Sequence, residues 1–208
     1  MKNPVALGRA LVALLAMAIL VATPLSARAD DSWREKAQRA GLFCSSNVTG
    51  VTTQAGLSAT TPALTLYNPK GSGKDLVLYA VGWHHTVAPA AASTVWLAVN
   101  NDPNAAAVTG TLTSTKIFNT LIGNTSSPTG QCLLAATLPA APTAALNLGA
   151  MLTGAITTAP SVGVNWTYFD GAFVVHPGGA VSFQTSTASG ASGFWGTFIW
   201  YETETSLP

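Results

Sequence analysis

The chain has 208 residues with nine basic and eight acidic side chains, so only 8% of it is charged, against about 25% in an ordinary soluble domain. A net charge this close to zero gives no electrostatic footprint for nucleic acid or an anionic membrane surface. The length suits one domain with a substantial core, and its surface must be built from Thr, Ser, Ala, Asn and Gly.

The first 29 residues have the pattern of an export leader. Lys2 and Arg9 form a basic start, residues 10–21 are apolar, and Ala27-Arg28-Ala29 is a small-x-small cleavage site. Cleavage leaves a chain that begins at Asp30 with six basic and eight acidic residues, a net charge of −2, in a secreted, periplasmic or cell-surface protein. An uncleaved anchor is the alternative, but the apolar run is shorter than the roughly 20 residues that span a bilayer. No stable membrane anchor is therefore expected after processing.

A short helical arm follows, over residues 30–41. Ser32 and Glu35 have the spacing of a capping box, which predicts a helix over residues 32–40 that ends at Gly41. The arm is either a solvated terminus or a docking segment.

From residue 42 to residue 208 the sequence predicts one β domain. Runs of β-branched and apolar residues alternate with turn signals, and helical periodicity is almost absent. We expect strands at residues 63–67, 75–83, 93–100, 109–118, 131–138, 151–157, 165–168, 172–175, 181–185 and 193–202, with a loop over 139–148. This pattern favours an all-β fold, a two-sheet antiparallel sandwich of jelly-roll type.

The last strand is the most aromatic stretch of the chain and is apolar on both alternating faces. Because aromatic side chains bury roughly 150–250 Å² each, the core must form around this strand. A strand with two apolar faces is covered on both sides, by a second sheet or by another subunit. The candidate interface residues are Phe194, Trp195, Phe198, Trp200 and Tyr201.

Cys44 and Cys132 are the two cysteines of the chain. Because an exported protein folds in an oxidising compartment, we expect one structural disulfide between them. Two unpaired thiols or an intermolecular bridge are the alternatives.

No motif for nucleotide or metal binding is complete. Gly71-Ser72-Gly73-Lys74 lacks the upstream glycine and the downstream Ser or Thr of a phosphate-binding loop, and we expect a hairpin loop there. His84 and His85 are adjacent on a predicted strand and point to opposite faces, and nothing in the spacing demands that His176 join them. We expect no metal and no cofactor.

Catalytic groups are also scarce. The nucleophile motif Gly-x-Ser-x-Gly does not occur, and the candidate carboxylates for hydrolysis, such as Asp170 and Glu202, are few and scattered. We therefore expect no enzymatic activity. Exposed aromatic residues could instead bind sugars or fill the core, and the candidates are Trp83, Trp96, Trp166 and Tyr168.

Two stretches carry a resemblance. Residues 64–78, with Asn68-Pro69 and Gly71-Ser72-Gly73-Lys74 before an apolar strand, resemble a segment of small phage-associated structural proteins. His176-Pro177-Gly178-Gly179 followed by the aromatic strand is similar to trimeric jelly-roll proteins, namely head-decoration, fibre and tumour-necrosis-factor-like domains. The resemblance implies a trimer with the aromatic strand near the three-fold axis. Since a capsid protein assembled in the cytoplasm needs no export leader, a surface protein with the same fold is the other interpretation.

These observations predict a secreted, non-enzymatic structural or assembly protein, a trimeric virion-like or cell-surface jelly-roll module. The expected partner is a second copy of the chain, and nucleic acid is not expected. The alternative is an extracellular carbohydrate-binding or adhesin module whose partners are surface glycans.

Overall fold

A computed structural model of the chain describes residues 33–39, 41–87, 89, 91–101, 106–112, 117–151, 163–188 and 193–205. The chain divides into two compact units, Met1–Glu35 and Lys36–Pro208. The predicted leader and its cleavage site lie outside the described residues, as does most of the strand predicted at residues 151–157. The predicted arm contains one short helix, α2 (Trp33–Gln38), and the Gly41 amide donates to the Lys36 carbonyl at 3.0 Å just beyond its end.

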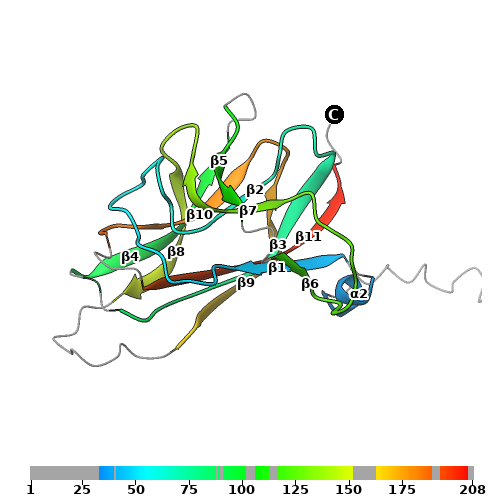
Figure 1. Cartoon of the computed structure of the whole chain (residues 1–208), viewed down its shortest axis with the longest axis horizontal. Coiled ribbons are helices and arrows are strands. Elements are labelled where there is room, and N and C mark those ends of the chain that lie inside the picture. The colour runs from blue at the N-terminus through cyan, green and yellow to red at the C-terminus, as the bar shows by residue number, and fades with distance from the viewer. Residues whose placement is uncertain are drawn as a thin grey trace, which may run out of the picture. The chain divides into compact units, whose positions relative to one another are not determined.

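The rest of the described chain is built from strands in two antiparallel sheets (Figure 1). The five-stranded sheet has the order β6-β1-β11-β3-β9, and the six-stranded sheet has the order β5-β7-β2-β10-β4-β8. The strands are β1 (Leu42–Ser46), β2 (Thr65–Tyr67), β3 (Lys74–His85), β4 (Ser93–Asn100), β5 (Thr109–Leu112), β6 (Ile117–Asn119), β7 (Gln131–Thr137), β8 (Thr143–Met151), β9 (Asn165–Val175), β10 (Ala180–Thr185) and β11 (Phe194–Glu204). The predicted all-β class with two antiparallel sheets is confirmed.

Eight of the strands pair in a nested way. Strand β1 pairs with β11, β2 with β10, β3 with β9 and β4 with β8. The first strand therefore pairs with the last, and each later pair lies within the previous one along the sequence. Successive pairs alternate between the two sheets, and two further pairings, β11 with β3 and β10 with β4, join the pairs within each sheet. Strands β5, β6 and β7 are inserted between β4 and β8.

The two sheets share one hydrophobic core. Leu78 and Phe198 come from the five-stranded sheet, Leu97 and Phe183 from the six-stranded sheet, and all four are fully buried in the same cluster. The Phe183 and Phe198 rings lie 4.8 Å apart between centroids and link the layers directly. The arrangement is sandwich-like, as expected when each sheet buries one apolar face.

Strand β11 occupies the centre of the five-stranded sheet, between β1 and β3. Its side chains alternate between buried and partly exposed along the strand, in the period of two that a β-strand imposes. Phe194, Phe198 and Trp200 point into the core and are fully buried. The prediction that the core forms around this strand is confirmed.

Three element predictions are wrong. Residues 109–118 are not one strand, because β5 pairs with β7 in the six-stranded sheet while β6 pairs with β1 in the other. The predicted loop at 139–148 contains most of β8, an edge strand whose pairing with β4 does not require an apolar face. Residues 165–168 and 172–175 form one strand, β9, with positive φ angles at Asp170 and Gly171 in the middle.

The segment 68–73 is not the predicted hairpin loop, because β2 and β3 belong to different sheets. It is held by Asn68, which is fully buried. The Asn68 side-chain amide donates to the carbonyls of Lys74 (2.7 Å) and Val175 (2.8 Å), and its oxygen accepts from the Ser72 hydroxyl (2.7 Å). One buried asparagine thus ties the crossover between the sheets to the end of β9.

The predicted Cys44–Cys132 disulfide is absent, and this corrects the sequence-based expectation. Cys44 lies in β1 opposite Ile199, whereas Cys132 lies in β7 opposite Leu66 and is buried in the core. Packed sheets lie about 10 Å apart, and disulfides need Cα atoms within about 7 Å. Spacing along the chain carries no information about which sheet each cysteine joins.

Candidate interaction surface

The side of the five-stranded sheet that faces away from the core is called the outer face here. Strand registers place five residues in one row across all five strands: Phe118, Cys44, Ile199, Ala80 and Tyr168. None of these residues is charged, and Phe118 is 55% exposed. An antiparallel sheet with one solvated face normally carries polar side chains there, so this row is unusual for a surface exposed to water.

A second row, Ser46, Thr197, Gly82 and Trp166, is also uncharged. The hydroxyl oxygens of Ser46 and Thr197 lie 2.6 Å apart and form a hydrogen bond between β1 and β11. Trp166 is 43% exposed although its side chain is large and apolar. The centre of the outer face therefore carries no charge on any of its strands.

The five candidate interface residues divide between the two sides of β11. Phe194, Phe198 and Trp200 belong to the core and are not available to a second copy in this fold. Trp195 and Tyr201 are partly exposed on the outer face. The Trp195 ring stacks on His84, with centroids 5.8 Å apart and planes within 5°, and the Lys36 ammonium lies 3.6 Å from the centroid of the Tyr201 ring.

The four sugar-binding candidates also separate. Trp83 is buried in the core, where its indole N–H donates to the Leu148 carbonyl at 3.1 Å, and Trp96 is partly buried on β4. Trp166 and Tyr168 are exposed neighbours on β9, and their rings contact each other. Phe118 was not among the sequence candidates, and its Thr-rich surroundings gave no signal that its strand joins β1.

The carboxylates considered for hydrolysis are engaged in structural contacts. Glu202 accepts three hydrogen bonds, from the Thr129 amide (3.1 Å), the Thr129 hydroxyl (2.9 Å) and the Gly130 amide (2.8 Å). Glu204 pairs with Lys74, and the buried Asp75 lies 2.8 Å from Nδ1 of His176. Asp170 is exposed in the middle of β9. The structure brings no two of these carboxylates together with a nucleophile.

The histidines do not form a cluster. His84 stacks on Trp195 and His85 on Trp83, while His176 lies beside Asp75. Within the described parts of the chain, no group of three or more His, Cys, Asp or Glu residues is placed to hold a metal ion.

Burial shifts the pKa of three groups. The pKa of the Cys44 thiol is raised by burial, and a backbone hydrogen bond from Phe118 partly offsets this. The pKa of His85 is lowered, first by burial and then by the neighbouring His84. The pKa of Tyr79 is raised by burial and by its neighbours Tyr168 and Asp170.

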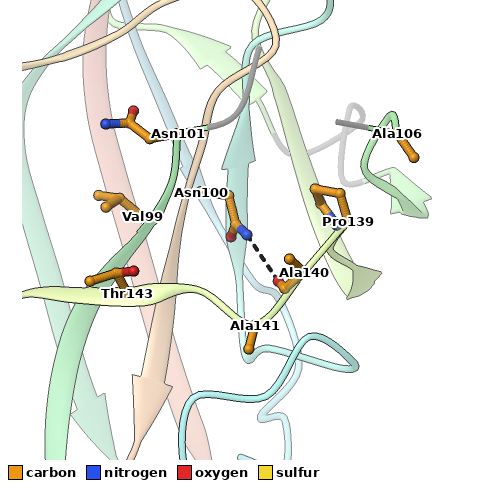
Figure 2. Close-up of a pocket in the computed structure, with 8 residues that line it drawn as sticks. All are labelled: Val99, Asn100, Asn101, Ala106, Pro139, Ala140, Ala141 and Thr143. Carbon is orange, nitrogen blue, oxygen red and sulfur yellow. Dashed lines mark hydrogen bonds between the residues drawn. The ribbon is translucent and has the colours of Figure 1, made fainter. Parts of the chain in front are cut away.

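Three of the cavities lined by described residues lie elsewhere on the molecule. Figure 2 shows one of about 340 Å³, between the end of β4 and the segment before β8, where the Asn100 amide donates to the Ala140 carbonyl at 2.9 Å. Two more, of about 310 and 250 Å³, lie beside Val51 and beside Thr129. No titratable side chain lines any of these three cavities.

In the part of the chain that the structure describes, no helix is both long and apolar enough to cross a membrane. Comparisons of the chain with protein-family models, with curated proteins and with solved structures found no match.

Proposed function

We propose that the chain is a non-enzymatic, exported structural module with a jelly-roll fold that assembles with copies of itself. The fold proposal is supported by the nested pairing of eight strands, which gives the orders β1-β11-β3-β9 and β2-β10-β4-β8. A jelly roll is such a two-sheet structure of eight strands and two Greek keys. In this proposal β5, β6 and β7 form an insertion that adds strands to both sheets.

Assembly through the outer face is carried by one observation, the uncharged row from Phe118 to Tyr168 across the whole sheet. Exposed apolar surface marks an interaction site, and Phe118 and Tyr168 are 55% and 64% exposed at the two ends of this row, with Ala80 buried between them. Because the two central rows carry no charge, they can meet a copy of themselves without like-charge repulsion, which suits a homo-oligomer. A trimer is the assembly that the sequence resemblance implies, and it belongs to the same proposal.

The test is the mass of the mature protein in solution, measured by light scattering at micromolar concentration. We expect an oligomer, and we expect Ile199→Lys or Phe118→Lys to convert it to a monomer because a copy would have to bury the new charge. Val48→Lys is the matched control, since Val48 is 53% exposed in a loop after β1. A wild-type monomer would overturn the assembly proposal.

Cys44 supplies a second readout on the same face. Its thiol is partly exposed within one chain, whereas Cys132 is buried. In the assembly we expect Cys44 to react slowly with a thiol reagent, and in the Phe118→Lys variant to react faster. Equal reaction rates in an oligomer and its monomeric variant would place the contact elsewhere.

A second candidate function is binding of surface glycans. It is favoured by the exposed, adjacent rings of Trp166 and Tyr168, because an aromatic ring held at a surface can stack on the apolar face of a sugar.

A further inference from the structure

We propose that Trp166 and Tyr168 form a flat two-ring platform that binds a neutral glycan by stacking on its pyranose rings. This inference rests on the second candidate function, and it competes with self-assembly for Tyr168, which also ends the uncharged row. It assigns the binding site to β9, the edge strand of the five-stranded sheet, together with the small residues of β3 that lie opposite.

The Trp166 ring lies flat on the sheet over Gly82. Gly82 is the cross-strand partner of Trp166, and a Cβ atom added to Gly82 would lie 2.8, 2.9 and 3.0 Å from three consecutive atoms of the six-membered ring. Near-equal distances to neighbouring ring atoms mean that the Cβ direction meets the face of the ring, since an edge-on approach would leave the flanking atoms clearly farther away. The indole therefore covers Gly82 face-down and presents its other face to solvent.

Tyr168 continues this surface. Its ring plane lies within 26° of the Trp166 plane, and the two centroids are 6.4 Å apart. That spacing is close to the two-residue repeat of a strand, about 6.6 Å, as expected for two neighbouring side chains on one face of β9. Tyr168 stands opposite Ala80, which is fully buried although it belongs to the outer face, and Tyr79 meets the Tyr168 ring edge-on at 72°.

The chemistry of the platform matches a sugar. Trp166 and Tyr168 are 43% and 64% exposed, and the exposed polar residues Asn165 and Asp170 flank them on the same strand. A pyranose ring offers an apolar C–H face for the rings and hydroxyl groups for the polar flanks. Strand β9 contains no lysine or arginine, and the one lysine of β3, Lys74, lies at its far end in the ion pair with Glu204. The platform therefore offers a polyanion no lysine or arginine partner on strand β9 or on the nearby part of β3.

The size of the platform also favours a small ligand over a second protein copy. Two aromatic side chains bury roughly 150–250 Å² each at most, whereas a stable protein interface buries about 800 Å² per partner. The platform lies on the edge strand, at the opposite side of the sheet from β6. Because the Trp166 ring already lies flat on Gly82 in the unbound chain, little ordering is required when a ligand binds.

The experiment is titration of the mature protein with soluble oligosaccharides of glucose, galactose and N-acetylglucosamine, followed by calorimetry and tryptophan fluorescence. We expect at least one series to bind, and Trp166→Ala to weaken that binding by about tenfold or more. Trp166→Phe should retain most of the affinity because it keeps a ring. Val48→Ala is the control, an exposed apolar residue in the loop after β1 that belongs to neither proposed surface.

Gly82→Ala tests the positioning of the platform. The added methyl group would displace the Trp166 ring, which is exposed and free to swing away, so we expect an unchanged unfolding midpoint and a loss of binding comparable to that of Trp166→Ala. Unchanged affinity in Gly82→Ala would show that a flat ring is not required and would overturn the assigned geometry.

The remaining outcomes are decisive. If no oligosaccharide binds at millimolar concentration, or if Trp166→Ala binds as well as wild type, the glycan platform is wrong. If Trp166→Ala lowers the mass of an oligomer instead, the two rings belong to the interface between copies. Retained sugar binding in a monomeric Phe118→Lys variant would support the platform and separate it from assembly.

Discussion

At the scale of single residues, His85 lies where a positive charge is unfavourable. Its imidazole stacks on the buried Trp83 ring, with centroids 6.2 Å apart, and His84 is the next residue along the chain. Burial first and His84 second lower its pKa in the folded state. The unfolded chain, whose histidine has an ordinary pKa near 6.5, therefore takes up a proton at a higher pH than the folded chain does.

This imbalance predicts a pH dependence of stability. The contribution of His85 is fully present above pH 6.5 and is lost as the pH falls from there toward the lower pKa of the folded state. We expect the free energy of unfolding, measured with urea, to fall between pH 7.5 and pH 5.5. His85→Gln should flatten that slope, because glutamine does not titrate. A variant that keeps the wild-type slope would show that other groups cause it.

At the scale of elements, the end of β11 holds the segment before β7 through a single carboxylate. Glu202 accepts all three of its hydrogen bonds from Thr129 and Gly130, and the space above Gly130 is filled by Leu76 and Trp200. Glu204, two residues farther along, is 81% exposed and makes one ion pair with Lys74. Hydrogen bonds to a charged group contribute about 1.5–3 kcal/mol each, whereas an exposed ion pair contributes about 0–1 kcal/mol.

Two matched substitutions follow from this difference. We expect Glu202→Gln to destabilise the fold by about 1–3 kcal/mol, since it removes the charge and replaces one acceptor oxygen with a donor. Glu204→Gln should change stability by less than about 1 kcal/mol. Urea unfolding of both variants gives the comparison. If the two variants lost equal stability, the hydrogen bonds of Glu202 would stabilise the fold no more than the exposed ion pair of Glu204 does.

At the scale of the whole molecule, the positions of the two thiols follow from the pairing of the strands into two sheets. Cys44 is on the outer face of the five-stranded sheet, and Cys132 is buried in the other sheet, so they are not placed to form a bridge within one chain. We expect a reducing agent to leave the unfolding temperature of the chain unchanged. Alkylation and mass measurement of the unreduced protein should label both cysteines, with Cys132 labelled only after unfolding. A chain that resists labelling in denaturant would contain the disulfide after all.

Much of the strand content was readable from local pattern. The alternation of residues 93–100 predicted β4 with the correct ends, and the aromatic run near residue 198 identified the central strand. Aromatic and β-branched residues in a period of two bury one face of a strand wherever it lies, so this signal does not depend on the neighbours. Strand β8 was not predicted, because an edge strand can be held by backbone pairing with few apolar side chains.

The sequence by itself determined that the chain is β-rich and poor in charge, and that its last strand lies in the core, since these properties follow from side-chain chemistry and its period along the strand. Only the tertiary structure decided which strands pair, and with that the separation of Cys44 from Cys132 and the row from Phe118 to Tyr168. Pairing between distant strands depends on packing across the whole core. The contact between Gly82 and the Trp166 ring depends on the same pairing, so the sequence around Gly82 gave no sign of it.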